Sequence, residues 1–168
     1  MSIRVRRASQ ADYEEIIEIY SFESVISQTS QLPYGSREFW MNFYKEKSDH
    51  SIELVVMYDN RVVGHMGILL ETSPRRKHVG RFGLAVHPRY QGKGCGTALM
   101  AELINMADNW LNLTRLELEV SSENRVAIDL YEKFGFDMEG TAVDALFFRG
   151  RYLDSYHMAR INSGDRTD

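Results

Sequence analysis

One stretch, residues 81–100, constrains this chain more than any other. It reads Arg-Phe-Gly-Leu-Ala-Val-His-Pro-Arg-Tyr-Gln-Gly-Lys-Gly-Cys-Gly-Thr-Ala-Leu-Met. An apolar run up to Val86 is followed by three alternating glycines, Gly92, Gly94 and Gly96, and a helical pattern begins at once. This order predicts a strand, a glycine-rich loop and a helix.

The predicted loop has the properties of an anion-binding site. Glycine tolerates positive φ and lets a ligand approach the backbone N–H groups closely. The first N–H groups and the positive dipole end of the following helix favour a phosphate. Gln91 and Lys93 add side-chain donors. Taken alone, the loop could also be a glycine-rich connection without a ligand.

Two familiar nucleotide-binding motifs fit the loop poorly. The spacing of Gly92, Gly94 and Gly96 lacks the full G-x-G-x-x-G pattern, and no acidic residue about 20 residues further on ends a second strand. A P-loop requires Gly-Lys-Ser/Thr, whereas Cys95 follows Gly94.

Composition predicts one globular domain over residues 1–161 and a polar tail over residues 162–168. The 168 residues are 43% hydrophobic and 26% charged, which is typical of a globular domain. A net charge of −4 argues against nucleic-acid binding. The single cysteine excludes an intrachain disulfide and a cysteine-rich metal site, and no apolar run reaches 18 residues. We therefore expect a cytoplasmic protein without a metal and without membrane contact.

Alternation and apolar periodicity predict the remaining elements in the order βααβββαβαββ. Strands are expected at 3–6, 52–58, 61–70, 78–86, 113–120, 136–148 and 152–160. Four helices are expected, after a capping box at 9–12, from 36 to about 47, from about 97 to 111, and from 123 to a C-cap at 135, whereas residues 24–36 are expected to be irregular. The expected core residues of the third helix are Leu99, Leu103, Met106, Ala107 and Trp110.

A second motif follows at a fixed distance. The loop reads Gln-x-x-Gly-x-Gly from Gln91 to Gly96, and the later helix reads Asn124-x-x-Ala-x-x-Leu-Tyr131-x-x-Phe-Gly-Phe136. In this order the two motifs resemble the acetyl-CoA-binding signatures of the GCN5-related N-acetyltransferase (GNAT) family. The likeness is strongest between residues 62 and 136.

The resemblance implies an α/β (α+β) GNAT fold. Its central sheet would be mixed but mostly antiparallel, with about seven strands and about four helices. The strands at 78–86 and 113–120 would splay apart, and acetyl-CoA would be the co-substrate. The implied cofactor-binding residues are Leu84, Ala85 and Val86 for the pantetheine amides, Gln91, Gly92, Lys93, Gly94, Cys95, Gly96 and Thr97 for the pyrophosphate, and Asn124 for the pantetheine arm. Asn124 could instead cap its helix, and Cys95 fits a small filler better than a nucleophile.

The implied reaction is direct acetyl transfer to a primary amine in a ternary complex. Tyr131 stands where family members often keep the general acid that protonates the leaving thiolate, although it could also be a helix tyrosine packed beside Phe134. Several relatives keep a glutamate in the strand before the loop, but no carboxylate occurs between Val79 and Val86. The remaining options are an amine that arrives neutral or a water chain held by His65, His78 or Glu119.

Further likenesses suggest the acceptor. The pairs and runs 64–65, 74–78, 109–110 and 150–160 resemble bacterial N-acetyltransferases that act on free L-amino acids. This would make Gln31, Pro33 and the final hairpin part of the acceptor side, with Arg75 and Arg76 holding a carboxylate, unless they form a solvated hairpin tip. The alternatives are an acetyltransferase for protein N-termini, polyamines or antibiotics, and a silent acyl-CoA sensor. We also expect a small-molecule amine partner and a homodimer.

Overall fold

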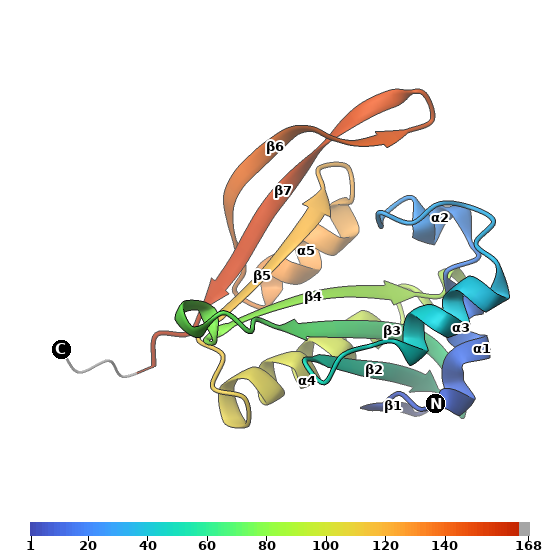
Figure 1. The fold of residues 1–168 in the computed structure, drawn as a ribbon, viewed down its shortest axis with the longest axis horizontal. Helices are drawn as coiled ribbons and strands as arrows, with labels where there is room; N and C mark the ends of the chain where they lie inside the picture. The colour runs from blue at the N-terminus through green and yellow to red at the C-terminus, as the bar shows by residue number, and fades with distance from the viewer. Residues whose placement is uncertain (165–168) are drawn as a thin grey trace. The chain divides into compact units, whose positions relative to one another are not determined.

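The structure is a computed structural model that describes residues 1–164 and forms two compact units (Figure 1). Unit 1 consists of Met1–Leu69 and Gly83–Glu102. Unit 2 consists of Leu70–Phe82 and the described residues from Leu103 onward. Of the predicted tail, residues 165–168 lie outside the described part of the chain, and the single-domain assignment stays a prediction.

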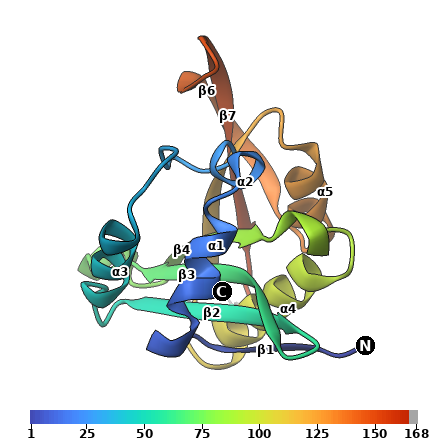
Figure 2. The ribbon, with the colours of Figure 1, turned by 90° about the vertical axis from the view of Figure 1, so that its right-hand side faces the viewer.

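Unit 1 contains the first three strands, the early helices and the glycine-rich loop. Its elements are β1 (Ile3–Arg7), η1 (Gln10–Asp12), α1 (Tyr13–Ile19), α2 (Glu23–Ile26), α3 (Arg37–Lys45), β2 (Ser51–Tyr58), β3 (Arg61–Leu70), the end of β4 (Val79–Val86), η3 (Pro88–Tyr90) and the first part of α4 (Cys95–Asn109). Helices α1 and α3 pack on one face of the β2–β3 hairpin, as Figure 2 shows. The cluster that joins them contains Ile16, Trp40, Tyr44, Val55 and Val62.

The β2–β3 hairpin turns at Asp59 and Asn60, both with positive φ, as the predicted two-residue turn requires. Its register changes between Met57, which pairs with Val62, and Val56, which pairs with Gly64. Such a β-bulge places one extra residue on one strand of the pair.

Unit 2 is built on the last three strands. Its elements are η2 (Pro74–Arg76), the start of β4, the end of α4, β5 (Arg115–Ser121), α5 (Arg125–Lys133), β6 (Asp137–Phe148) and β7 (Arg151–Ile161). Strand β7 pairs antiparallel with both β5 and β6. The β6–β7 hairpin, orange to red in Figure 1, turns at the predicted Arg149-Gly150 step, where both residues have positive φ.

Strand β4 belongs to both units, and the strand order through it is β1-β2-β3-β4-β5-β7-β6. The parallel pairing of β4 with β5 joins Val79–Arg81 to Arg115–Glu117, at the start of both strands. Strand β4 runs on to Val86 and β5 to Ser121, so the pairing is shorter than either strand, as a splayed sheet requires. The predicted mixed sheet of seven strands is confirmed for the described residues.

Three details differ from the expectation. The described residues form five α-helices where about four were expected, because the short helix α2 (Glu23–Ile26) lies in the segment expected to be irregular. Helix α4 begins at Cys95 and ends at Asn109, two residues earlier at each end than predicted. Trp110 therefore lies beyond the helix and is 79% exposed, so it is not a core residue.

Within the described chain, no helix combines the length and apolarity that crossing a bilayer requires.

The predicted capping box anchors the start of α1. The Asp12 carboxylate is buried and accepts hydrogen bonds from Ser9 N at 2.7 Å and from both Arg6 terminal nitrogens at 2.7 Å. The hydrogen bonds from Arg6, followed by those from Ser9, lower the pKa of Asp12 against the opposing effect of burial. These contacts attach β1 to the first turn of the helical segment.

We predict that Asp12→Asn lowers the free energy of unfolding at pH 7 by about 1–3 kcal/mol, because Arg6 and Ser9 lose an ionised acceptor. Since the folded pKa of Asp12 lies below its unfolded value, its stabilisation is complete above about pH 4 and is lost as pH falls through the folded pKa. Denaturant titrations should therefore show that the difference in the free energy of unfolding between the wild type and Asp12→Asn becomes smaller below pH 4. Asp59→Asn, at an exposed carboxylate, is the matched control and should cost little. A difference in the free energy of unfolding that does not change with pH would contradict a stabilising role of the ionised Asp12 carboxylate.

Candidate active site

In unit 1, the entry to the glycine-rich loop is fixed by two side chains. The His87 side chain is buried, and its Nδ1 accepts from Arg89 N at 3.1 Å, while the backbone N–H of His87 donates to Val63 O at 2.8 Å. Gln91 Nε2 donates to Val86 O at 3.0 Å. One Gln91 N–H and one lone pair of the Val86 carbonyl are therefore used within the protein, and the expected roles of both residues toward the co-substrate stay predictions. Ala85 and Val86 are buried and Leu84 is half-buried.

The loop itself is open to solvent. Residues 91–94 are exposed, φ is +71° at Gly92 and +88° at Gly94, and a Cβ at Gly92 would meet nothing within 4 Å. The hydrogen bond from Ala98 N to Gly94 O, 2.9 Å long, is the first to enter α4. The N–H groups of the three preceding residues, from Cys95 to Thr97, are thus available as donors. An exposed backbone without side chains at the start of a helix fits a diphosphate.

Two neighbouring side chains complete the loop. Lys93 Nζ lies 5.0 Å from the ring centroid of Tyr90 and 5.3 Å from that of Tyr58, which holds a positive charge at the loop. Cys95 is 1% exposed, and burial raises the pKa of its thiol against the opposing charge of Lys93. The thiol therefore stays neutral and buried, as expected of a filler.

In unit 2, Tyr131 lies on α5 and is 6% exposed. Its ring packs edge-on against Phe82, with centroids 5.7 Å apart, and lies 6.1 Å from that of Phe136, so the tyrosine is packed against these two rings. Among residues 1–164 its hydroxyl has no hydrogen-bond partner. Burial raises the pKa of Tyr131 to about 12, so the phenol keeps its proton at neutral pH.

Asn124 caps α5. Its Oδ1 accepts a hydrogen bond from Ala127 N at 3.3 Å, and the residue is half-buried. The helix-capping role that the sequence left open is therefore present. Contact with the pantetheine arm stays a prediction.

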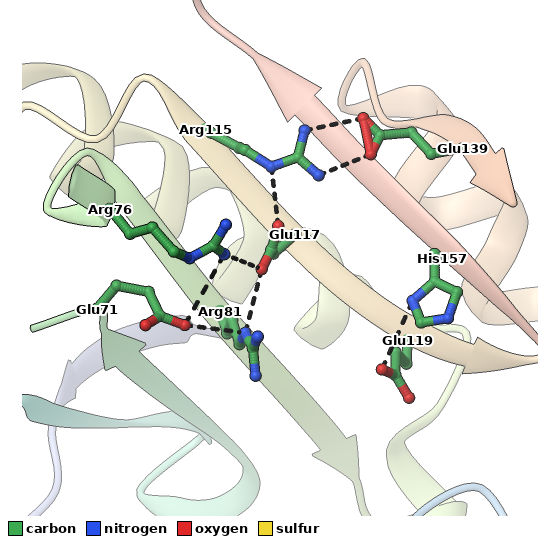
Figure 3. A network of polar contacts seen from close by, with 8 residues as sticks. All are labelled: Glu71, Arg76, Arg81, Arg115, Glu117, Glu119, Glu139 and His157. Carbon is green, nitrogen blue, oxygen red and sulfur yellow. Dashed lines mark hydrogen bonds and ion pairs between the residues drawn. The ribbon is translucent and has the colours of Figure 1, made fainter. Parts of the chain in front are cut away.

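Arg76 belongs to a network of polar contacts around Glu117, shown in Figure 3. Glu117 Oε1 accepts hydrogen bonds from Arg76 at 2.8 Å and Arg81 at 3.1 Å, and its Oε2 accepts one from Arg115 at 2.8 Å. Arg115 also pairs through both terminal nitrogens with Glu139. Burial alone would raise the pKa of Glu117, but the three arginines outweigh it and lower the pKa.

The other predicted acceptor residues of unit 2 are more exposed. Arg75 is exposed and forms no ion pair with any residue that the structure describes, and His78 is exposed too. Glu119 Oε1 lies 3.5 Å from His157 Nδ1 (Figure 3). Arg75 and Arg76, adjacent in the sequence, thus differ, because Arg76 is already neutralised.

His65, in unit 1, is buried and has two hydrogen-bond partners. It is 4% exposed, its Nδ1 lies 2.9 Å from the Tyr20 hydroxyl, and its Nε2 lies 2.5 Å from Glu53 Oε2. Sequence reasoning missed Tyr20 and Glu53. Of the other predicted residues of this unit, Gln31 is half-buried and Pro33 is exposed.

The strand order and the two motifs at 91–96 and 124–136 define the class of the protein, an acyl-CoA-dependent transferase. Comparison with known proteins agrees. Residues 13–136 match the model of the "Acetyltransferase (GNAT) family". The chain therefore belongs to the GNAT family, and it is an acetyl-CoA-dependent N-acetyltransferase.

Two relatives and one solved structure extend the comparison. The chain is 40% identical over 159 residues to the L-amino acid N-acetyltransferase AaaT of Escherichia coli K12, covering 95% of this chain and 98% of that protein. It is 26% identical to the spermidine N(1)-acetyltransferase of Vibrio cholerae, covering 96% and 94%. A spermidine N-acetyltransferase structure from Vibrio cholerae, in complex with CoA and spermine, superposes with a TM-score of 0.86 at 25% identity and covers 96% of both chains.

We predict that Gly94→Val raises the KM for acetyl-CoA by roughly tenfold or more. The reason is that φ of +88° strains any β-branched residue, and losing one charge-assisted hydrogen bond to phosphate costs about 1.5–3 kcal/mol. Steady-state kinetics with varied acetyl-CoA measure the effect. Gly140→Val is the control, since a Cβ at Gly140 in β6 meets nothing within 4 Å and its φ is not positive. An unchanged KM at Gly94→Val would show that the loop does not approach the phosphates.

Proposed function

We propose that the enzyme acetylates the α-amino group of a free L-amino acid by direct attack of the amine on the thioester in a ternary complex. The observation that carries this proposal is the 40% identity to an L-amino acid N-acetyltransferase across almost the whole of both chains. The spermidine acetyltransferases, which are also similar over nearly the full length, reach 26%. A free amino acid differs from a polyamine in carrying a carboxylate.

The charges of unit 2 supply a group for that carboxylate. Arg75 is exposed and has no carboxylate partner within the described residues, whereas Arg76 is bound by Glu117. A guanidinium can bind a carboxylate through two parallel hydrogen bonds. We therefore assign the carboxylate of the acceptor to Arg75.

The co-substrate supplies the acetyl thioester, and the chain's own groups bind it and move protons. The N–H groups of the loop from Gln91 to Thr97 bind the diphosphate, and the backbone of Leu84–Val86 together with Asn124 binds the pantetheine arm. Tyr131 donates its proton to the sulfur as the carbon–sulfur bond breaks and the carbon–nitrogen bond forms. Its buried and neutral phenol supports this role, because a general acid must hold its proton until charge develops on the leaving group.

A polyamine is the second candidate acceptor. It is favoured by the solved relative that was crystallised with spermine and by the full-length match to spermidine acetyltransferases. A polyamine has no carboxylate, so an enzyme specific for it would not need Arg75.

We expect thiol release from acetyl-CoA with free L-amino acids at a higher kcat/KM than with spermidine, aminoglycosides or peptides with a free N-terminus. Arg75→Gln should raise the KM for the amino acid by roughly tenfold, because a charge-assisted contact is lost, and should leave thiol release with the corresponding amino acid amide nearly unchanged. Exposed Arg89, changed to Gln, is the control. Preference for spermidine would contradict the proposal and support a polyamine acetyltransferase, and tight acetyl-CoA binding without turnover on the whole panel would indicate a sensor.

We predict that Tyr131→Phe lowers kcat by roughly 10²-fold with little change in either KM, the scale of a lost general acid. Because the pKa of Tyr131 is about 12, the wild-type kcat should not fall through ionisation of this phenol below pH 10. Trp110→Phe, at an exposed aromatic residue just after α4, is the control and should keep the wild-type rate. Unchanged turnover in Tyr131→Phe would remove this residue from its role.

A further inference from the structure

Three side chains of unit 1 form a continuous hydrogen-bonded chain that the reaction described so far does not use. The Tyr20 hydroxyl lies 2.9 Å from His65 Nδ1, and His65 Nε2 lies 2.5 Å from Glu53 Oε2. Glu53 Oε1 in turn lies 3.0 Å from Lys47 Nζ. Tyr20 and Glu53 are half-buried and His65 is buried, so the imidazole lies between two partly accessible ends.

The direction of the hydrogen bonds follows from the charge on Glu53. Burial by itself would raise the pKa of this carboxyl, but the hydrogen bond from His65 and the pairing with Lys47 act against burial, and the pKa is lowered. An ionised carboxylate only accepts, so His65 Nε2 carries a hydrogen and donates it to Glu53. In a neutral imidazole Nδ1 is then the acceptor, and the Tyr20 O–H is the donor. The Tyr20 oxygen keeps its lone pairs for one further donor.

The chain of contacts lies beside the part of β4 that precedes the loop. Tyr20 packs against a cluster that includes Ile19, Val25 and Ala85 of β4. The backbone N–H of His87, the residue after β4, donates to Val63 O, two residues before His65 in β3. The strand itself offers no carboxylate between Val79 and Val86. A proton acceptor is therefore absent from the strand but present next to it.

We propose that Tyr20, His65 and Glu53 form a proton relay that deprotonates the acceptor amine. This inference rests on the proposed acetylation of an amine. The ammonium donates a proton to the Tyr20 oxygen while the Tyr20 O–H proton passes to His65 Nδ1. The nitrogen–hydrogen bond of the substrate breaks, its electron pair stays on nitrogen as the nucleophile, and His65 becomes an imidazolium. Glu53 keeps its charge and stabilises that imidazolium, which later returns the proton to solvent.

The groups packed around the relay suit this task. The Tyr20 ring stacks on Trp40 from α3, with centroids 5.3 Å apart, and the Tyr44 ring meets His65 edge-on at 5.5 Å. Tyr13 from α1 stacks on Tyr44, and burial raises the pKa of both Tyr20 and Tyr44, so these phenols stay neutral. The charged neighbour is Lys47, which is paired with Glu53. The relay thus holds a carboxylate and an imidazole in a largely aromatic surrounding.

The test compares Tyr20→Phe with Tyr44→Phe. Both tyrosines contact the His65 ring, but only Tyr20 shares a hydrogen bond with it among the described residues. With the amino acid acceptor at pH 7, we expect Tyr20→Phe to lower kcat/KM by roughly 10²-fold, the scale of a lost general base, and Tyr44→Phe to stay within about threefold of wild type. The loss in Tyr20→Phe should shrink as pH rises toward the pKa of the acceptor amine, because the amine is then already neutral.

A structural role would give a different result. Loss of packing or of hairpin stability would lower activity by the same factor at every pH, and this outcome would overturn the relay. Glu53→Gln serves as the second variant, since it removes the charge that stabilises the imidazolium while keeping the side-chain shape, and it should show the same dependence on pH. Thermal unfolding and acetyl-CoA binding, measured on each variant, show that the fold and the co-substrate site are intact.

The outcomes separate the relay from the proposed function. If Tyr20→Phe keeps the wild-type turnover of amino acids at pH 7, the relay is overturned but the proposed function is not. A wild-type enzyme that acetylates no amine would overturn the proposed function and the relay with it. A loss in Tyr20→Phe and Glu53→Gln that disappears at high pH would support both.

Discussion

The Glu53 carboxylate imposes the strongest constraint on unit 1, because a charge removed from water must be compensated by hydrogen bonds and opposite charge. Glu53 lies on β2, its hydrogen-bond partner His65 on β3, and its ion-pair partner Lys47 just after α3. Tyr20, which follows α1, completes the set through His65. One acidic side chain therefore fixes two strands and the ends of two helices, and the aromatic residues of α1 and α3 cover the contacts.

This arrangement depends on a bulge whose position the sequence analysis did not predict. A straight hairpin with its turn at Asp59 and Asn60 would pair His65 with Leu54, whose side chain points to the opposite face from that of Glu53. The bulge shifts the register so that His65 pairs with Val55, which shares a face with Glu53. Gly64, which follows the bulged residue Val63, is the kind of residue that often marks a bulge, but it does not say which neighbour is left unpaired. The sequence could therefore single out His65 but not its partners.

Features determined by neighbours in the sequence were predictable. The glycine-rich loop, the capping box at Asp12 and the Arg149-Gly150 turn each follow from a few adjacent residues, and the structure has them at the expected positions. Features determined by distant partners were not. Gln91 is bound to Val86 O and Arg76 to Glu117, contacts that require knowledge of how the chain returns to itself. The prediction that Trp110 is a core residue was wrong for a local reason, because helix α4 ends before this residue.

The two adjacent arginines show how such distant contacts change a functional interpretation. Glu117 is mostly shielded from solvent and accepts hydrogen bonds from three arginines, so withdrawing Arg76 toward a substrate would remove part of the compensation of a partly buried charge. Arg75 has no ion-pair partner within the described chain, so binding a carboxylate there breaks no internal ion pair. An exposed guanidinium gives up more hydration on binding, yet exposed pairs are individually weak, about 0–1 kcal/mol. Selectivity for a carboxylate would then require that substrate binding itself excludes water from Arg75.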